Sequence, residues 1–94
     1  MLISYGAPGT LIAGPDEADR VITQALHVGA ALLAAEQVGA GQHLLDLAVD
    51  YAKTRLQFGR PIGSFQAVKH KLADMLVDLE HARSAAYHAA WALT

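Results

Sequence analysis

One segment that contains Gly and Pro divides this chain into two long stretches that are rich in Ala and Leu. The segment "RLQFGRPIGSFQ", residues 55–66, places Gly59, Pro61 and Gly63 between two patterns of helical spacing. These patterns predict helices over residues 16–55 and 64–93. Gly59 would end the first helix in a left-handed conformation, and Ser64 would cap the second. The sequence therefore predicts an all-α fold, a long antiparallel helical hairpin.

The first predicted helix is apolar nearly all round, which is typical of a buried helix. Asp16 is the expected N-cap. The stripe of larger apolar residues that runs from Ile22 to Tyr51 also contains Glu36 and His43. These two are either catalytic groups or buried polar groups that meet partners on a neighbouring helix. The second interpretation is favoured, because seven residues separate them by about 10 Å along the helix axis.

Residues 1–15, "MLISYGAPGTLIAGP", differ from the rest of the chain. Short apolar pieces alternate with Gly and Pro, a pattern typical of extended segments between turns. They are too short to form a sheet alone. We expect an irregular or extended tail that belongs to a preceding β domain, followed by a partial helical domain over residues 16–94.

The predicted helices are too long for a compact domain of this size. The second alone would extend about 45 Å, whereas a compact domain of 94 residues has a radius of gyration of about 12 Å. A lone pair would leave much of the first helix in water. We therefore expect either a fragment of a longer protein or an obligate oligomer, a dimer or tetramer, in which further helices complete the bundle.

Composition excludes several classes of function. The net charge of −2 gives no basic footprint for nucleic acid. No cysteine is present, which excludes disulfides and thiolate metal sites. No membrane span is expected, because Glu36, His43, Asp46 and Asp50 interrupt the longest apolar run. Without a basic segment after Met1, a signal peptide is not expected, and the protein is expected to be soluble and cytoplasmic.

Four potential metal ligands follow one face of the second predicted helix: His70, Asp74, Asp78 and His81. Imidazole and carboxylate groups are ordinary zinc ligands. They are also ordinary residues of a solvated helix face, and this arc lies opposite the apolar stripe. The solvated face is the favoured interpretation, so no metal site is predicted.

Residues 55–66 themselves include side chains that could form a binding loop. Arg55 would stand at a helix end with its guanidinium free to hold a phosphate through two hydrogen bonds. Two amides, Gln57 and Gln66, and two rings, Phe58 and Phe65, surround it. The alternative is a plain turn in which Arg55 and Arg60 cap carbonyls. The residues alone favour neither interpretation.

Residues 34–91 resemble the C-terminal helical domain of acyl-CoA dehydrogenases. The resemblance depends on fixed spacings: Tyr51-Ala-Lys-Thr-Arg55-x-Gln-Phe-Gly59, Pro61-Ile62, Phe65-Gln66-Ala67, Leu72-Ala-Asp-Met75 and Glu80-x-x-Arg83. Residues 1–33 fit more loosely. The resemblance implies that this two-helix hairpin is half of a four-helix bundle. It also implies that self-association of the chain completes the bundle.

The resemblance also implies a function. Family members bind FAD, remove the α-proton of an acyl-CoA with a carboxylate base and pass a hydride to the flavin, and an electron-transfer flavoprotein usually receives the electrons. They assemble as dimers of dimers. By resemblance, Arg55 contacts the pyrophosphate of a neighbouring subunit's FAD, Gln57 and Phe58 lie beside it, and Gln66 is a further contact.

Departures from the family pattern limit that implication. Ala30 stands where many members have a substrate-binding arginine, and Gly29 stands where a few have the catalytic base. The family's Gln-x-x-Gly-Gly segment is missing, so no catalytic residue is assigned. These residues alone are expected to be inactive and not to retain FAD. The alternatives are a non-catalytic, self-associating hairpin, or a relative with other flavin chemistry such as nitroalkane or aryl-acyl oxidation.

Overall fold

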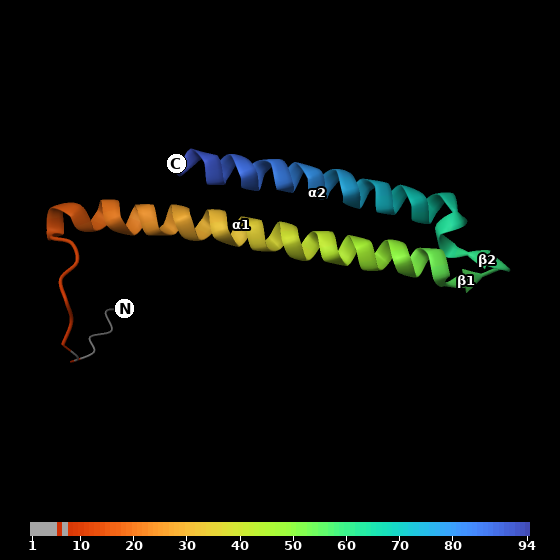
Figure 1. The fold of residues 1–94 in the computed structure, drawn as a ribbon, viewed down its shortest axis with the longest axis horizontal. Helices are drawn as coiled ribbons and strands as arrows, with labels where there is room; N and C mark the ends of the chain where they lie inside the picture. The colour runs from red at the N-terminus through yellow and green to blue at the C-terminus, as the bar shows by residue number, and fades with distance from the viewer. Residues whose placement is uncertain (1–5, 7) are drawn as a thin grey trace.

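The structure is a two-helix hairpin. The computed structural model describes residue 6 and residues 8–94. Helix α1 spans Pro15–Thr54 and helix α2 spans Gln66–Ala92, and the two lie antiparallel and side by side (Figure 1). The predicted all-α antiparallel hairpin is confirmed.

A short strand pair joins the helices and was not part of the prediction. Strands β1 (Leu56–Gln57) and β2 (Arg60–Pro61) form an antiparallel ladder, and the 3-10 helix η1 (Ile62–Ser64) leads into α2. The pair lies at the end of the hairpin that is remote from the start of α1 and from the end of α2 (Figure 1).

The N-terminal segment of the described chain, residues 6 and 8–14, contains no helix or strand. Residues 1–5 and 7 lie outside the described residues. The prediction that residues 1–15 are the tail of a β domain therefore stays a prediction.

Helix α1 begins with a proline rather than with a side-chain cap. Pro15 occupies the first helical position, which suits its fixed φ, and Gly14 is the N-cap without a side-chain hydrogen bond. Asp16, predicted as the cap, lies instead in the first turn with Glu17. That prediction is wrong because Pro15 starts the helix one residue earlier. The two carboxylates still stabilise α1, since negative charge near a helix N-terminus is favourable.

Helix α2 also starts without the predicted cap. Ser64 lies in η1, and its hydroxyl donates a hydrogen bond to the carbonyl of Pro61 at 2.7 Å. Phe65 is the N-cap, and its carbonyl accepts from the amides of Val68 and Lys69 at 3.1 and 3.0 Å. The prediction for Ser64 is wrong because the 3-10 turn engages its hydroxyl before α2 begins.

The seam between the helices follows small residues of α1. Ala31, Leu45 and Ala52 are buried there, as are Leu79 and Ala86 of α2. Seven of the buried and half-buried positions of α1 recur at steps of three and four: Ala31, Ala34, Val38, Gly41, Leu45, Ala48 and Ala52. This spacing is typical of antiparallel helices that cross at a small angle.

Gly41 gives one side chain of α2 the room it needs. A Cβ atom at Gly41 would lie 2.9 Å from Cδ1 of Leu79, well inside ordinary contact distance. Gly39, two residues earlier, has nothing within 4 Å of the same position. Gly39 and Gly41 therefore face different surroundings, and of these two only Gly41 is in close contact with a side chain of α2.

The stripe of large apolar residues on α1 is exposed, as expected for a lone pair of helices. Its members have between 52% and 68% of their surface exposed: Ile22, Leu26, Leu32, Leu33, Leu44 and Leu47. Glu36 and His43 are exposed as well. The prediction that Glu36 and His43 are buried polar groups is wrong for the hairpin, because α2 covers only the face of α1 that carries the smaller residues.

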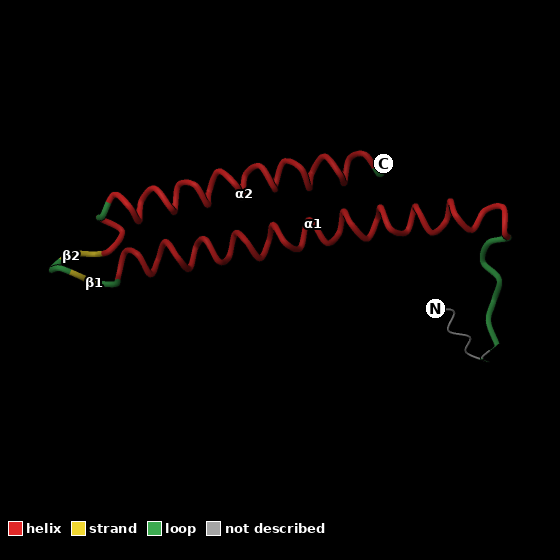
Figure 2. The backbone as a smooth tube through the Cα atoms, turned by 180° about the vertical axis from the view of Figure 1, so that it is seen from behind, coloured by secondary structure: helices red, strands yellow, loops and turns green. Residues whose placement is uncertain are grey.

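The hairpin is an elongated rod of 68 × 31 × 19 Å with a radius of gyration of 21.9 Å. Helix α1 continues past the C-terminal end of α2, so its first turns have no helix beside them (Figure 2). The accessible surface is 7900 Å², whereas a compact monomer of this length would expose about 5,200 Å². The hairpin therefore exposes far more surface than a self-contained domain does, and large apolar side chains of α1 are among the exposed residues.

Within the described residues, α1 is long and apolar enough to cross a membrane, judged by length and composition alone. An 18-residue window of it has a mean hydropathy of 1.3. Core helices of soluble bundles pass the same test. The exposed face of α1 thus requires a cover, which protein helices or lipid would each provide.

Candidate functional site

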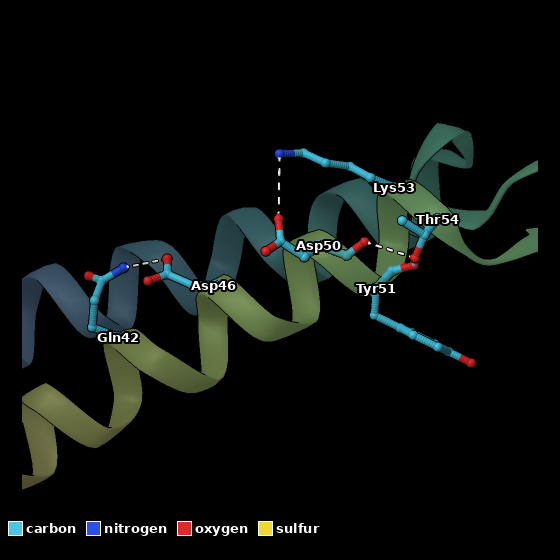
Figure 3. A network of polar contacts seen from close by, with 6 residues as sticks. All are labelled: Gln42, Asp46, Asp50, Tyr51, Lys53 and Thr54. Atoms are coloured by element: carbon cyan, nitrogen blue, oxygen red, sulfur yellow. Dashed lines mark hydrogen bonds and ion pairs between the residues drawn. The ribbon is translucent and has the colours of Figure 1, made fainter.

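Residues 55–66, which we call the hairpin loop, follow the last turn of α1, which side-chain contacts stabilise. The hydroxyl of Thr54 donates to the carbonyls of Asp50 and Tyr51 at 3.1 and 3.2 Å (Figure 3). Lys53 reaches back to Asp50, with Nζ 3.9 Å from Oδ1. A threonine hydroxyl that donates back to such carbonyls adds a side-chain hydrogen bond to the backbone bonds of the last helical turn. The loop therefore starts from a fixed point.

A tight two-residue turn forms the outermost part of the loop. Phe58 and Gly59 both have left-handed φ angles, 53° and 76°, between the paired strands β1 and β2. Two positive φ angles in a two-residue hairpin define a type I′ turn. Gly59 has the predicted left-handed conformation, but it turns a strand pair and does not end α1. Phe58 is the unexpected residue, because a non-glycine residue in this region carries strain.

The backbone of Arg55 is held on both sides. Its amide donates to the carbonyl of Tyr51, and its carbonyl accepts from the amide of Ile62, each at 2.8 Å. Gly63 lies directly against α1, since a Cβ atom there would be 2.9 Å from the carbonyl oxygen of Ala52. The start and the end of the loop are thereby packed on the last turn of α1.

The ladder places several polar side chains on one face of the loop. Gln57 pairs with Arg60, and Leu56 pairs with Pro61. Side chains of directly paired residues share a face, and side chains alternate along each strand. Gln57 and Arg60 therefore share a face, and Arg55, in extended backbone two residues before Gln57, joins them. Two guanidinium groups and one amide gather on this face.

Neither guanidinium of the loop has a hydrogen-bond or ion-pair partner among the described residues. No carboxylate there lies within 4.0 Å of Arg55 or Arg60, and neither side chain donates a hydrogen bond to a carbonyl. The alternative in which both arginines cap carbonyls is therefore not what the structure contains. Both side chains are exposed.

The two phenylalanines of the loop contact each other. The rings of Phe58 and Phe65 meet edge to face, with centroids 6.1 Å apart and planes at 79°. Phe58 is 92% exposed, whereas Phe65 is half-buried. Phe58 thus offers a flat apolar surface to a ligand, and Phe65 supports the loop from the α2 side.

Gln66 is the fourth predicted site residue and lies at the first position of α2. Its amide nitrogen is 3.0 Å from Nε2 of His70 one turn later. In the described part of the chain, no hydrogen bond joins Gln66 to Arg55 or Gln57. The structure thus brings Arg55 and Gln57 onto one face, whereas Gln66 follows from the start of α2.

Charge is strongly segregated along the chain, a feature that the net charge conceals. The stretch from Tyr51 to Ala73 contains five of the seven basic residues and none of the nine acidic ones. The five are Lys53, Arg55, Arg60, Lys69 and Lys71. The tip of the rod is therefore positive while the rest of it is negative, and a positive tip attracts anionic ligands. A count over windows of the sequence would have found this signal.

Other polar groups do not assemble into a site. His70, Asp74, Asp78 and His81 do not converge, and no group of three or more potential ligands that could hold a metal ion occurs among the described residues. A groove of about 290 Å³ lies along the helix seam, away from the loop. It is lined mainly by small apolar residues: Ala35, Val38, Gly39, Ala86 and Ala90, with Arg83 and Tyr87.

Comparison with known proteins identifies the family. Residues 20–94 match the family described as acyl-CoA dehydrogenase, C-terminal domain. The matched part includes both long helices almost entirely and the whole hairpin loop, so the fold and the candidate site both lie within it.

Individual relatives agree with this match. The chain is 62% identical over 55 residues to the acyl-CoA dehydrogenase IpdE2 of Mycobacterium tuberculosis, covering 58% of this chain and 17% of the relative. It is 42% identical over 81 residues to the probable acyl-CoA dehydrogenase YngJ of Bacillus subtilis, covering 86% and 21%. It is also 52% identical over 66 residues to the 3-sulfinopropanoyl-CoA desulfinase of Paraburkholderia xenovorans, covering 70% and 16%.

The chain spans about a fifth or less of the length of these relatives. Its two helices and its loop nevertheless lie in the part that the family match covers. The chain therefore belongs to the acyl-CoA dehydrogenase family, whose C-terminal helical domain it matches.

Proposed function

We propose that this chain supplies a cofactor-binding segment of an FAD-dependent acyl-CoA dehydrogenase. The observation that carries the proposal is the state of Arg55. Its amide and carbonyl are each fixed by a hydrogen bond of 2.8 Å, while its guanidinium is exposed and without a protein partner in the described chain. A fixed backbone with a free guanidinium is a preorganised site for a phosphate group.

The residues of the loop fit FAD by their chemistry. Arg55 and Gln57 offer donors for a pyrophosphate from one face, and Gln66 offers a further amide at the start of α2. The exposed ring of Phe58 offers a flat surface for a planar group. When bound, FAD accepts a hydride from the substrate; the residues of this chain hold and orient the cofactor. By family resemblance, that FAD is bound mainly by a neighbouring subunit.

The positions that carry catalytic or substrate-binding groups in other members have none here. Gly29 and Ala30 belong to α1, and a Cβ atom at Gly29 would have nothing within 4 Å. Dehydrogenation of an acyl-CoA therefore requires a base and a substrate-binding group other than these residues. Acyl-CoA and an electron-transfer flavoprotein are the proposed partners of the complete enzyme, in the cytoplasm.

Self-association, to a dimer or tetramer, is the proposed cover for the exposed apolar face. The hairpin exposes roughly 2,700 Å² more than a compact monomer would. An excess of this size matches the area that obligate oligomers bury. Family membership favours a bundle of helices as the cover, rather than lipid. The isolated chain should accordingly be colourless and at least dimeric; a yellow, monomeric preparation would contradict the proposal.

A second candidate is another flavin-dependent reaction on a CoA thioester. The specific observation is the 52% identity to a 3-sulfinopropanoyl-CoA desulfinase. That relative contains a segment similar to this chain, and its name describes a different reaction. The loop cannot separate the two reactions, because it would bind the cofactor in both. Turnover of saturated acyl-CoA against 3-sulfinopropanoyl-CoA by the whole protein distinguishes them.

The test of the proposal compares Arg55→Ala with Lys53→Ala in the whole protein. Both changes remove one positive charge from the tip, but Lys53 is paired with Asp50. Loss of a charge-assisted hydrogen bond costs about 1.5–3 kcal/mol, so Arg55→Ala should raise the Kd for FAD roughly tenfold or more. Lys53→Ala should change it less than twofold. Equal losses of affinity, or a lower melting temperature for Arg55→Ala at saturating FAD, would assign Arg55 a structural role.

A further inference from the structure

The side chain of Arg60 has a defined position in the loop although it makes no hydrogen bond within the described part of the chain. Its Cζ atom lies 4.0 Å from the centroid of the Phe65 ring. Phe65 is half-buried at the start of α2 and is itself supported by the edge-to-face contact with Phe58. A guanidinium that stacks on a ring is attracted by the ring's negative face and restricted in its rotations.

Stacking leaves the donors of Arg60 available. A cation–π contact engages the charge of the guanidinium and uses none of its five N–H donors in a hydrogen bond. No described carboxylate lies within 4.0 Å of it, and none of the hydrogen bonds of the described chain involves its side chain. Arg60 is thus a positioned cation with unused donors at an exposed surface.

The ladder register puts these donors beside those of Arg55 and Gln57. Gln57 and Arg60 are directly paired, so their Cβ atoms lie about 5 Å apart on one face. Arg55 shares this face from two residues before Gln57. A pyrophosphate diester carries two negative charges on adjacent phosphates, and two guanidinium groups on one face match it better than one.

We propose that Arg60 is a second phosphate-binding residue of the hairpin loop, held in place by Phe65. The loop then binds the diphosphate of a dinucleotide through two guanidinium groups, one from each strand of the pair. This inference rests on the proposed binding of FAD, and it assigns Phe65 the role of a positioning residue, which acts on the ligand only through Arg60.

The experiment measures the Kd for FAD of the whole protein, stripped of its cofactor and titrated again, with Arg60→Ala and Arg60→Lys. Arg60→Ala should raise the Kd roughly tenfold, as expected for one charge-assisted contact at an exposed site. Arg60→Lys keeps the charge but loses the planar fork, so its Kd should lie between those of the wild type and Arg60→Ala. Lys53→Ala, the matched loss of charge, should change the Kd less than twofold.

The role of Phe65 is tested by a double-mutant cycle. Phe65→Leu keeps the apolar bulk and removes the ring face, and should raise the Kd about threefold in the presence of Arg60, in the range of an exposed cation–π contact. In the Arg60→Ala background, Phe65→Leu should have no further effect. Independent, multiplying effects would overturn the positioning role.

The outcomes separate this inference from the proposed function. If Arg55→Ala weakens FAD binding and Arg60→Ala does not, the second phosphate contact is wrong and the proposed function stands. If neither change weakens binding, the proposed function fails as well. Equal effects of Arg60→Ala and Lys53→Ala would show that only the general positive charge of the tip matters, and would overturn the inference. Titration with ADP, which has the diphosphate without the flavin, should give the same order of variants.

Discussion

The contact between Gly63 and α1 gives the sharpest prediction about the fold. A Cβ atom at this position would lie 2.9 Å from the carbonyl oxygen, 3.2 Å from the carbonyl carbon and 3.3 Å from Cβ of Ala52. Ala52 is 4% exposed and belongs to the last turns of α1. Because these atoms are mostly backbone, they cannot give way as the end of a flexible side chain would. Gly63→Ala must therefore push the loop away from α1.

The expected cost of Gly63→Ala is about 1–3 kcal/mol, the usual range for an added methyl group in a packed contact. Gly39→Ala is the matched control, since nothing lies within 4 Å of a Cβ atom there. In a helix interior this exchange should stabilise by about 1 kcal/mol. The two substitutions add the same methyl group and should act in opposite directions.

The assay is urea unfolding of the chain, followed by circular dichroism at one protein concentration, because self-association makes apparent stability depend on concentration. In a thermal scan at the same protein concentration, Gly63→Ala should lower the melting temperature by roughly 4–8 °C for each kcal/mol lost. The same change should weaken FAD binding in the whole protein, because the Ile62 amide next to Gly63 holds the carbonyl of Arg55. A Gly63→Ala variant as stable as the wild type would refute the close approach between loop and helix.

Three further substitutions test other parts of the structure. Phe58→Asn should stabilise the chain by about 1 kcal/mol, because Asn-Gly suits a type I′ turn, and should weaken FAD binding through loss of the ring; no gain in stability would contradict the left-handed φ. Gln42→Leu removes the amide that accepts a hydrogen bond from Arg83 and should cost about 1 kcal/mol in urea unfolding, whereas no change would show that this bond contributes nothing. Leu44→Lys, at a residue that is 61% exposed in the hairpin, should shift sedimentation toward the monomer without lowering the helicity per residue; an unchanged oligomer would place the interface elsewhere.

The sequence predicted the two helices well because their ends carry strong local signals. Pro15 and the acidic residues after it mark one start, and the Gly and Pro residues after Thr54 mark one end. The observed helices, Pro15–Thr54 and Gln66–Ala92, stay close to the predicted 16–55 and 64–93. The N-caps were predicted wrongly. Asp16 and Ser64 are good caps by residue type, but Gly14 and Phe65 occupy the N-cap positions without a side-chain hydrogen bond.

The faces of α1 could not be predicted from local pattern. Both sides are apolar, so periodicity does not say which one meets α2, and the stripe with the larger residues was the natural choice. The hairpin uses Ala31, Leu45 and Ala52 instead, because small residues permit a close helix pair. The larger residues are left for a partner that the hairpin alone does not supply.

The site was predicted by residue type but not by geometry. Arg55 and Gln57 share a face because of the β1–β2 strand pair. The turn of this pair could not be predicted, since it requires a positive φ at Phe58 and phenylalanine rarely adopts one. Arg60 was considered only as a helix cap, whereas the structure stacks it on Phe65. The positive tip was hidden because the acidic residues elsewhere bring the net charge to −2.

The most direct test of the central claim observes the cofactor's phosphates. A ³¹P NMR spectrum of FAD bound to the whole protein should show pyrophosphate resonances that move in Arg55→Ala and stay in place in Lys53→Ala, at FAD concentrations that saturate each variant. Movement confined to Arg55→Ala is the predicted result, because that guanidinium would contact the phosphate oxygens. Identical spectra for the wild type and Arg55→Ala would contradict the claim that the hairpin loop holds the pyrophosphate of FAD.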